Sequence, residues 1–265
     1  MITQRFALYM RNHDWFAVLI EIGVVIVGLM LAFQLDGWVE QRGEREKETE
    51  YIHRLIDDFE ADAVAIQFAI DVASMRLRLA DLLMEVSHDP AVALGRPVEF
   101  LGAINQAAYT YTPSLTSHTF EDLRSTGNMR LLLDQGLKDA MYDYYGHDLA
   151  QRQYRPLQLA TEHRHFELVA GVLSHAQEVF AQDTLGFFDP YGIDSIENTK
   201  TDLAQIKVAA KRFSERPELI AWLPQVRHLQ IEQMGVHDSR LSRGKTVLES
   251  LYRHTVGAGP KSEGE

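Results

Sequence analysis

The sequence predicts an all-α fold, in which an N-terminal transmembrane helix continues into a long amphipathic helix packed in an extramembrane helical bundle. Three features favour this fold. The stretch from Trp15 to Leu35 is apolar, with Glu21 as its one formal charge. The chain from Val39 to Val86 contains no proline and a single glycine. Glycine (17) and proline (8) are sparse among the 265 residues, which favours long helices over a turn-rich β fold.

The composition narrows the class of protein. Apolar residues make up 46% and charged residues 24% of the chain, values typical of a folded domain rather than a disordered one. A net charge of -12 argues against nucleic-acid binding, because neutralising phosphates requires clustered lysine and arginine. The chain has no cysteine, which excludes disulfides, thiolate metal sites and cysteine nucleophiles.

The apolar stretch has the length of a membrane span. At about 1.5 Å rise per residue, Trp15 and Trp38 lie about 35 Å apart on a helix, which would place one indole at each membrane interface. The unbroken apolar run, 22–33, is shorter and also suits a buried core helix or the core of a signal peptide. No small-x-small cleavage site follows it, so we expect an uncleaved anchor. The predicted divisions are a short N-terminal segment, the span, a helical domain and a disordered tail: 1–14, 15–38, 39–255 and 256–265.

One stripe of the predicted span is suited to contact another helix. Successive steps of four, three and four residues place four side chains on one face: Glu21, Val25, Gly28 and Ala32. Gly28 and Ala32 form a small-xxx-small pair, which lets a second helix approach closely. A carboxylate is costly within an apolar span, so Glu21 either hydrogen-bonds a partner helix or extends to the lipid headgroups. The sequence leaves both interpretations open.

Beyond the span, a heptad pattern predicts one long helix in a coiled coil or bundle. Apolar residues recur at alternating steps of four and three through more than four repeats. The charged residues between 44 and 48 predict a solvated start to this part of the helix. The members of the pattern are Ile52, Ile56, Phe59, Ala63, Ile66, Ile70, Ala73, Leu77, Ala80 and Met84.

Turn-forming residues divide the rest of the chain into further helices. One helix is expected to start near Ser117 and to end at Gly127-Asn128, because both residues tolerate a positive φ. Loops are expected at 87–90, 95–97, 112–114 and, packed down by aromatic residues, at 183–198. The other predicted helices are 98–109, 134–180 with a disturbance near Pro156, 201–213, and 217–254 with a bend or restart at Pro224.

Two motifs resemble a known family. Residues 21–38 open an apolar helix with a glutamate and end it in Ala-Phe-Gln-Leu-Asp-Gly-Trp, and residues 119–128 read Thr-Phe-Glu-Asp-Leu-Arg-Ser-Thr-Gly-Asn. With these motifs, residues 15–145 resemble the DUF6090-like family of bacterial single-pass membrane proteins. The resemblance implies that Ser125, Gly127 and Asn128 belong to a shared Thr-Tyr-x-x-Leu-x-Ser-x-Gly-Asn motif. The family has no assigned activity, so the resemblance implies an architecture and no chemistry.

Several polar clusters have a chemical and a plainer structural interpretation. The densest contains His163 and His165, with Glu162, Glu167 and His175 nearby. The two histidines diverge by about 200° on a helix, unlike a His-Glu-x-x-His metal site, so we expect exposed or capping side chains.

Other clusters receive the plainer interpretation as well. His228 and Glu232 have the spacing of a surface pair. The acidic group at Asp57, Asp58, Glu60 and Asp62 predicts a solvated face, because a helix spreads these carboxylates around its axis. Ser125 has no recognisable base, so its segment is expected to be a packed turn held by Asn128. The tyrosines are expected in the core: Tyr142, Tyr144, Tyr145 and Tyr154.

These features favour a structural or interaction protein. We expect no enzyme, and neither catalytic residues nor a cofactor nor a metal site. The stripe and the heptad pattern predict a membrane-anchored scaffold or accessory subunit that associates with itself or with a larger membrane protein complex. The alternative is an extracytoplasmic ligand-binding or sensory bundle, which would need a separate signalling partner because about 14 residues precede the span. The expected partners are membrane lipid and other membrane protein subunits, and not nucleic acid.

The resemblance to a bacterial family implies the inner (cytoplasmic) membrane. Arg5 and Arg11 precede the span, and the basic residues after it slightly favour a cytoplasmic domain: Arg42, Arg45, Lys47 and Arg54. Those residues are interleaved with glutamates, however, and long domains translocate largely regardless of charge. We therefore favour a periplasmic C-terminal domain.

Overall fold

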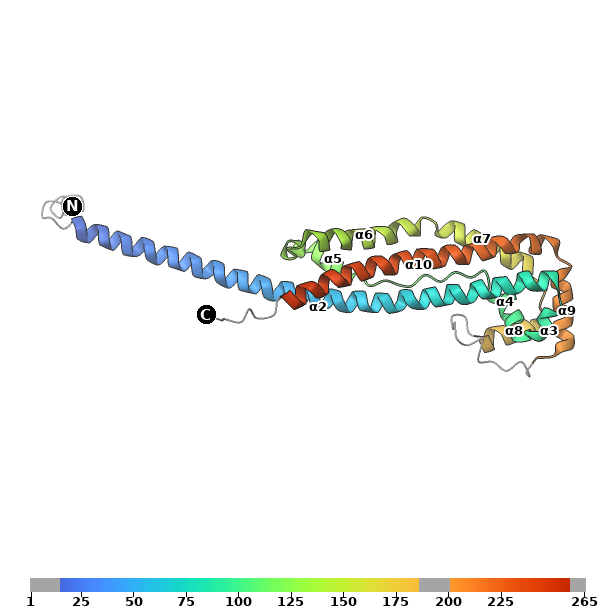
Figure 1. Ribbon diagram of the computed structural model, residues 1–265. Helices are drawn as coiled ribbons and strands as arrows, with labels where there is room; N and C mark the ends of the chain where they lie inside the picture. The colour runs from blue at the N-terminus through green and yellow to red at the C-terminus, as the bar shows by residue number, and fades with distance from the viewer. Residues whose placement is uncertain (1–14, 186–200, 258–265) are drawn as a thin grey trace.

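A computed structural model describes residues 15–185 and 201–257 of the chain (Figure 1). These residues form α-helices, a short 3₁₀ helix and connecting segments, with no β-strand among them. The prediction of an all-α fold is therefore confirmed. The expected N-terminal segment 1–14, most of the expected loop and the end of the tail lie outside the described residues, which leave out 1–14, 186–200 and 258–265.

Helix α2, Trp15–His88, is a single helix of 74 residues that projects from the domain and then forms its spine. Its first part extends alone from the rest of the molecule as far as Glu44, which pairs with Arg130 (Figure 1). Its second part lies inside the domain and buries Ile52, Phe59 and Ile66 of the predicted heptad pattern. The apolar N-terminal helix thus continues into the amphipathic helix without a break, as the scarcity of helix breakers predicts.

Helix α10, Pro217–Gly257, lies antiparallel along the second part of α2 (Figure 1). It runs through Pro224 as one helix, so the expected restart does not occur. Its buried residues recur at alternating steps of three and four, and the middle members of this row are polar. The row consists of Leu223, Val226, Gln230, Gln233, His237, Arg240, Gly244, Val247 and Leu251.

A second layer of helices covers α2 and α10 on one side: α5 (His118–Ser125), the 3₁₀ helix η1 (Asn128–Leu131), α6 (Gln135–Arg152) and α7 (Arg155–Val169). The disturbance expected near Pro156 is the break between α6 and α7, because Pro156 is the second residue of α7. The predicted continuation to residue 180 is wrong. Gly171 has a φ of 76°, which ends the helical path, and Arg216 caps α7 by donating from Nη1 to the carbonyl of Leu168 at 2.6 Å.

Four short helices close the end of the domain farthest from the projecting part of α2: α3 (Val92–Gly95), α4 (Pro97–Gln106), α8 (His175–Leu185) and α9 (Leu203–Ser214). Of these, α4 and α9 correspond to the predicted helices 98–109 and 201–213, whereas α3 and a separate α8 are not predicted. Together with the adjacent ends of α2 and α10 they enclose an apolar cluster, the distal core, which includes Leu83, Phe100, Ala210, Phe213 and Leu223.

A second apolar cluster lies nearer the projecting helix. This proximal core is formed by α2, α5, α6 and the last turns of α10, and includes Phe59, Phe120, Leu137, Tyr144 and Leu251. The polar part of the α10 row, from Gln230 to Arg240, lies between the two cores. The bundle is therefore zoned along its length into apolar, polar and apolar sections.

The chain crosses this polar section in an extended segment, the strap (residues 107–117), which joins α4 to α5. The strap has no helix or strand and runs alongside α2 and α10 (Figure 1). Ala107, Ala108, Thr110 and Pro113 are buried in it. Buried backbone groups outside regular structure need hydrogen-bond partners from side chains, so the strap determines which residues its neighbours can carry.

The left-handed backbone at Gly127, with a φ of 74°, gives a test of the turn after α5. We expect Gly127→Ala to lower the free energy of unfolding by about 1 kcal/mol, because a Cβ disfavours this conformation even though the space around it is open. Gly95→Ala is the matched control, since Gly95 also has open space and no positive φ. Urea unfolding measures both variants. Equal stability of the two would contradict the strained geometry at Gly127.

Candidate functional site

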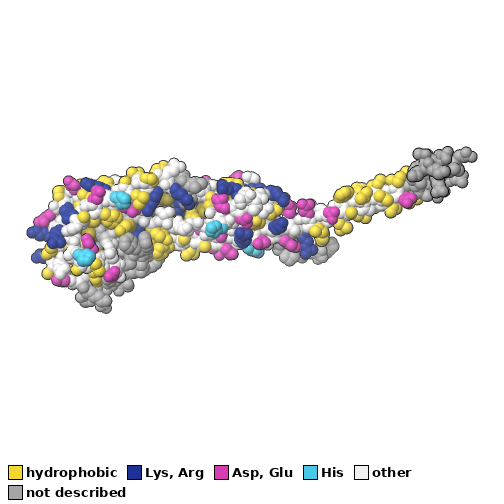
Figure 2. Space-filling view, turned by 180° about the vertical axis from the view of Figure 1, so that it is seen from behind, with side chains coloured by type: hydrophobic (Ala, Val, Ile, Leu, Met, Phe, Trp, Pro, Cys, Tyr) yellow, Lys and Arg dark blue, Asp and Glu magenta, His cyan; other side chains and the backbone are white. Residues whose placement is uncertain are grey.

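The apolar part of α2 is exposed along its described length. The large apolar side chains from Leu19 to Val39 each expose half or more of their surface. Figure 2 shows that hydrophobic side chains cover the projecting helix. The helix is long and apolar enough to cross a membrane, and no other described residue covers it. Burial of such a surface away from water is favourable, so this helix is suited to lipid or to a protein partner.

The predicted interface stripe lies on this exposed part of α2. Glu21, Val25 and Ala32 are exposed there, and a Cβ built on Gly28 meets no described atom within 4 Å. Of the two predicted interfacial anchors, Trp15 is the first described residue of α2, and the ring of Trp38 lies 5.9 Å beneath the guanidinium of Arg42. A cation over an indole at this position fits a boundary between apolar and polar surroundings.

The residues of the predicted family motif form a turn that contacts α2 where the helix leaves the domain. Asn128 donates from Nδ2 to the hydroxyl of Tyr51 at 3.0 Å, and that hydroxyl donates to Asp122 Oδ2 at 3.1 Å. Ser125 donates to the carbonyl of Asp122 at 3.3 Å within its own helix end. Gly127 supplies the left-handed turn between α5 and η1. The arrangement fastens the base of the projecting helix rather than presenting a nucleophile.

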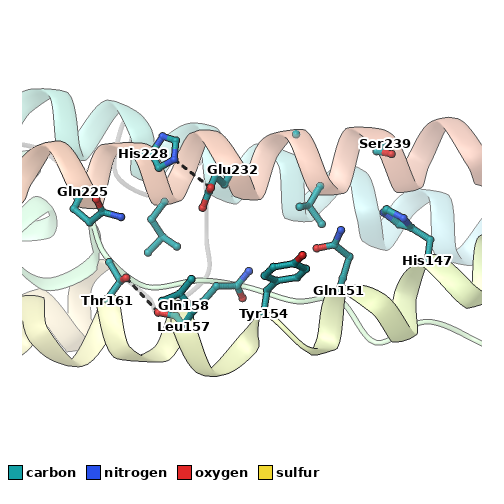
Figure 3. Close-up of a pocket in the computed structure, with 13 residues that line it drawn as sticks. His147, Gln151, Tyr154, Leu157, Gln158, Thr161, Gln225, His228, Glu232 and Ser239 are labelled. Atoms are coloured by element: carbon teal, nitrogen blue, oxygen red, sulfur yellow. Dashed lines mark hydrogen bonds and ion pairs between the residues drawn. The ribbon is translucent and has the colours of Figure 1, made fainter.

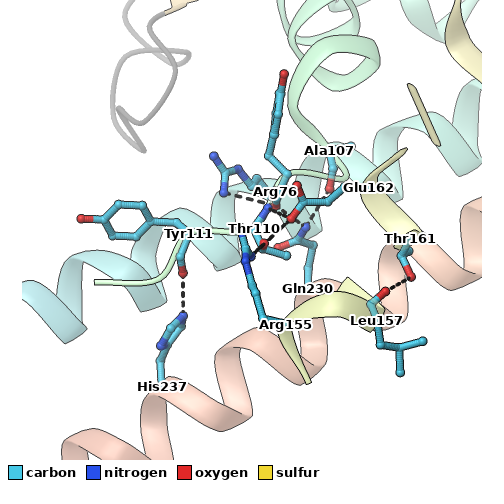
Figure 4. A network of polar contacts seen from close by, with 11 residues as sticks. Arg76, Ala107, Thr110, Tyr111, Arg155, Leu157, Thr161, Glu162, Gln230 and His237 are labelled. Carbon is cyan, nitrogen blue, oxygen red and sulfur yellow. Dashed lines mark hydrogen bonds and ion pairs between the residues drawn. The ribbon is translucent and has the colours of Figure 1, made fainter. Parts of the chain in front are cut away.

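The first part of the strap is held by a charged cluster on α2 and α7 (Figure 4). Glu162, 6% exposed, accepts hydrogen bonds at Oε1 from the backbone N–H of Thr110 at 3.0 Å and from the Thr110 hydroxyl. Arg155 lies 3.5 Å from the same carboxylate oxygen. Arg76, fully buried, donates to the carbonyl of Tyr109 at 3.2 Å. Burial lowers the pKa of Arg76 to about 10 against the opposing effect of Glu162, so Arg76 stays charged at neutral pH.

The polar row of α10 binds further carbonyls of the strap. Gln230 donates from Nε2 to the carbonyls of Ala107 and Tyr109, both at 2.9 Å. The Nε2 atom of His237 lies 3.0 Å from the carbonyl of Tyr111 (Figure 4). A carbonyl only accepts, so this nitrogen carries the proton of the ring. The strap thus takes its hydrogen bonds from side chains that would otherwise be unsuited to a core.

The last part of the strap is held by α2 and α6. Asp62 accepts from the backbone N–H of Thr116 at 2.8 Å and from the hydroxyl of Tyr144 at 2.9 Å, and Tyr145 donates to the carbonyl of Thr116 at 3.0 Å. Burial raises the pKa of Asp62, and these hydrogen bonds oppose that rise. The predicted solvated acidic face is therefore wrong for Asp62, which is 2% exposed, whereas Asp57 and Glu60 are exposed.

The predicted histidine cluster is divided by the structure. His163 and Glu167 are exposed, but His165 is fully buried, so the expectation of exposed or capping side chains is wrong for that residue. Burial lowers the pKa of His165 to about 4, which keeps the ring neutral at neutral pH. In the described ranges, no group of three or more histidine and carboxylate side chains is arranged to hold a metal ion.

A groove of about 600 Å³ separates α6 and α7 from α10 (Figure 3). His147, Tyr154 and Thr161 face it from one side, and the predicted surface pair, His228 and Glu232, faces it from α10 with 3.1 Å between Nε2 and Oε1. The four tyrosines do not share this groove: Tyr144 and Tyr145 belong to the proximal core, Tyr142 is half-exposed, and Tyr154 alone lines the groove.

Most of the residues that hold the strap are not predicted from the sequence. Glu162 and Asp62 belong to predicted polar clusters but are not expected to be buried, and Arg76, Gln230 and His237 are not predicted to have a role. The signal was present in α10, where a three-four row of otherwise apolar positions becomes polar in its middle. Polar residues at successive seam positions indicate a buried polar partner rather than a second apolar helix.

No family model, no curated protein and no solved structure matches this chain. The resemblance to the DUF6090-like family therefore stays a prediction that rests on its two motifs.

The bond between Tyr144 and Asp62 gives a prediction for stability. We expect Tyr144→Phe to lower the free energy of unfolding by about 2 kcal/mol, because it leaves a buried carboxylate with one hydrogen bond fewer. Tyr142→Phe removes the same atom from a half-exposed ring and serves as the control. Urea unfolding at neutral pH compares the two variants. Equal stability would show that the hydrogen bond from Tyr144 to Asp62 does not stabilise the fold.

The buried His165 gives a prediction for pH dependence. The unfolded chain protonates this ring near pH 6.5, whereas the folded chain does so only near pH 4. Its contribution is therefore complete above pH 6.5 and is lost as the pH falls towards 4. From pH 7 to pH 5 we expect His165→Leu to lose about 2 kcal/mol less unfolding free energy than the wild type. The unfolding free energy of the control, His163→Leu at an exposed position, should fall with pH as that of the wild type does. If the unfolding free energy of His165→Leu falls equally, the buried ring does not cause the pH dependence.

Proposed function

We propose that the chain is a membrane-anchored helical scaffold or accessory subunit, which associates through its transmembrane helix and stalk with itself or with a larger membrane protein complex. The stalk is the part of α2 that follows the span, residues 39–86. The observation that supports this proposal is the continuity of α2: an exposed apolar helix and the central helix of the domain are one element. A partner that binds the span is therefore joined to the domain without a flexible linker.

The charged start of the stalk sets the distance between membrane and domain. From Trp38 to Glu44, which pairs with the domain, the helix rises about 9 Å at about 1.5 Å per residue, and the charges of this part keep it in water. Arg42 pairs with Glu46 at 3.2 Å along the stalk, and Glu44 pairs with Arg130 of η1. The second pair ties the stalk to the motif turn, so the domain stands at a fixed height above the interface marked by Trp38.

Association in the membrane would use the stripe of Glu21, Val25, Gly28 and Ala32. Apolar side chains gain little by leaving lipid for another apolar helix, so close packing and hydrogen bonds decide which face associates. The small residues allow the close packing, and Glu21 gains most from a hydrogen-bond donor on a partner helix. The resemblance to a bacterial family supports the inner membrane as the location, with the domain in the periplasm.

A ligand-binding or sensory role is the second candidate, and the groove between α7 and α10 favours it. Its volume of about 600 Å³ lies within the range of small-molecule sites, and its walls mix apolar and polar side chains. Such a domain would pass its signal to a separate membrane partner, so the same stripe on α2 would serve both functions.

The stripe can be tested with a matched pair of glycines. We expect Gly28→Ile to lose the oligomer or the co-purified subunit that wild-type protein retains in mild detergent, because the branched side chain holds a second helix away. Gly23→Ile is the control, since Gly23 lies about 140° around the same helix and also has open space. Cross-linking in membranes, followed by native purification, measures both.

Two outcomes would contradict the proposal. A wild-type chain that is monomeric and purifies alone after gentle extraction has no partner for the stripe. Equal loss of association in Gly23→Ile and Gly28→Ile would show that bulk in the span, rather than this face, causes the effect.

A further inference from the structure

One wall of the groove between α7 and α10 is shaped by the break at Pro156. Helix α6 ends at Arg152 and α7 begins at Arg155, so Tyr154 lies at the junction of the two helices. Figure 3 shows the ring of Tyr154 in the groove, between the side chains of Gln151 and Gln158. The break therefore places an aromatic ring in the middle of this wall, with an amide on each side.

The lining of the groove is polar but carries little charge. The described residues that line it include no lysine, arginine or aspartate, although charged residues make up 24% of the chain. Its one glutamate, Glu232, already pairs with His228, at 3.1 Å between the two side chains. A charged ligand would lose its hydration here without gaining an unpaired opposite charge. The groove is therefore suited to an uncharged ligand.

Three amide groups in the groove are available to a ligand. The side chains of Gln151, Gln158 and Gln225 make no hydrogen bond to any described residue. Gln225 is exposed, and the amide atoms of the two half-buried glutamines are accessible to solvent. An amide both donates and accepts hydrogen bonds. These groups suit a ligand whose own groups do both, as hydroxyl groups do.

The same wall also exposes apolar surface. Tyr154 exposes 58% of its surface, its ring packs on no described ring, and its hydroxyl makes no hydrogen bond to a described residue. Leu157, one turn along α7, exposes 69%. Exposed apolar groups in a concave surface gain free energy when an apolar face covers them. The ligand that suits this groove therefore has apolar faces as well as hydroxyl groups.

We propose that the groove binds a neutral saccharide chain. A sugar ring is uncharged, with C–H groups on its faces and hydroxyl groups around its edge. One ring stacks on Tyr154, and its hydroxyl groups exchange hydrogen bonds with Gln151 and Gln158. The lining part of α10, from Gln225 to Ser239, is about 21 Å long at about 1.5 Å per residue, which suits several sugar units in a row. This inference rests on the second candidate function and names its ligand.

A peptide is a poorer match to the same groove. Extended peptides bind by pairing with the edge of a sheet, and the described part of the chain has no strand. A helical peptide buries a row of large apolar side chains in an apolar groove. Amides occupy both walls of this groove, with Gln225 on α10 and Gln158 on α7.

The groove is too far from the span for the headgroup of a glycolipid in the same membrane. Near the end of the groove at Gln225, Arg227 donates to Asp81 of α2 at 2.7 Å. Asp81 is about 64 Å from Trp38 along α2, at about 1.5 Å per residue. Because α10 is antiparallel to α2, Ser239 at the other end is about 21 Å nearer, still about 40 Å from Trp38. Headgroups extend only about 8 Å beyond the apolar core of a bilayer.

The test uses the full chain in micelles of a detergent without a sugar headgroup, because such headgroups would compete for the groove. The probes are cellotriose, maltotriose and chitotriose, with sorbitol as a polyol that has no ring. Sugars and polyols at high concentration stabilise folded proteins without binding a site, so saturation is the criterion. We expect at least one trisaccharide to raise the melting temperature saturably, and sorbitol not to do so. No saturable rise with any trisaccharide, or an equal rise with sorbitol, would overturn the proposal.

A matched pair of helical glycines locates the site. Gly235 lines the groove and Gly146 of α6 does not, and a Cβ built on either meets no described atom within 4 Å. Gly235→Leu should weaken trisaccharide binding by at least about tenfold, because its side chain fills the groove, without lowering the melting temperature of the free protein. Gly146→Leu should bind as the wild type. Equal affinity of the two variants would overturn the proposed site.

Two further comparisons identify the kind of ligand. Tyr154→Phe keeps the stacking ring and should bind more tightly than Tyr154→Ala; equal binding of these two variants would overturn the stacking and the proposal with it. Trialanine with blocked ends is the peptide probe. A saturable rise with trialanine that Gly235→Leu abolishes, and none with a trisaccharide, would overturn the saccharide and keep the ligand-binding role. A lack of binding by every probe would remove the support for both.

Discussion

The strap imposes the constraint on which the rest of the domain depends. An extended segment inside a helical bundle brings backbone N–H and C=O groups into a space where neighbouring helices have already used their own backbone groups. Side chains from four neighbouring helices supply hydrogen bonds to these groups: Arg76 and Asp62 from α2, Tyr145 from α6, Glu162 from α7, and Gln230 and His237 from α10. The apolar core is divided in two because the strap passes between its halves.

The same hydrogen bonds fix the register of the bundle. An all-apolar seam between α2 and α10 would tolerate a shift by one heptad, because its contacts are alike at each step. With the polar row in place, such a shift would bring either Gln230 or His237 opposite apolar side chains and would leave strap carbonyls unpaired. Burying a charge costs free energy, so we do not expect the buried charges to add stability. They favour one arrangement of the helices over others, and the opposite charges of Arg76 and Glu162 offset each other across the strap.

Sequence reasoning predicts the local features of this fold well and its long-range features poorly, for one physical reason. Helix α2 follows from a lack of helix breakers over a long stretch, and the break before α7 follows from Pro156; both signals are local. Gly171 escapes detection because a lone glycine in a helical pattern is tolerated, and only its φ of 76° reveals the end of α7. The burial of Asp62 is harder still to predict from the sequence, because its partners, Thr116 and Tyr144, are 54 and 82 residues away. A carboxylate on a helix looks solvated until those partners are known.

The membrane stripe and the strap contacts lie on different parts of the same long element and are energetically separable. Gly28 and Asp62, which holds the strap, are about 50 Å apart along α2 at about 1.5 Å per residue, and a Cβ on Gly28 meets no described atom. Changes at sites this far apart without shared partners act additively on stability. A substitution in the span that alters the contacts of the strap, or one at the strap that alters association, would therefore require a movement of α2 as a whole. The continuity of α2 from Trp15 to His88 is the structural feature that permits such a movement to connect them.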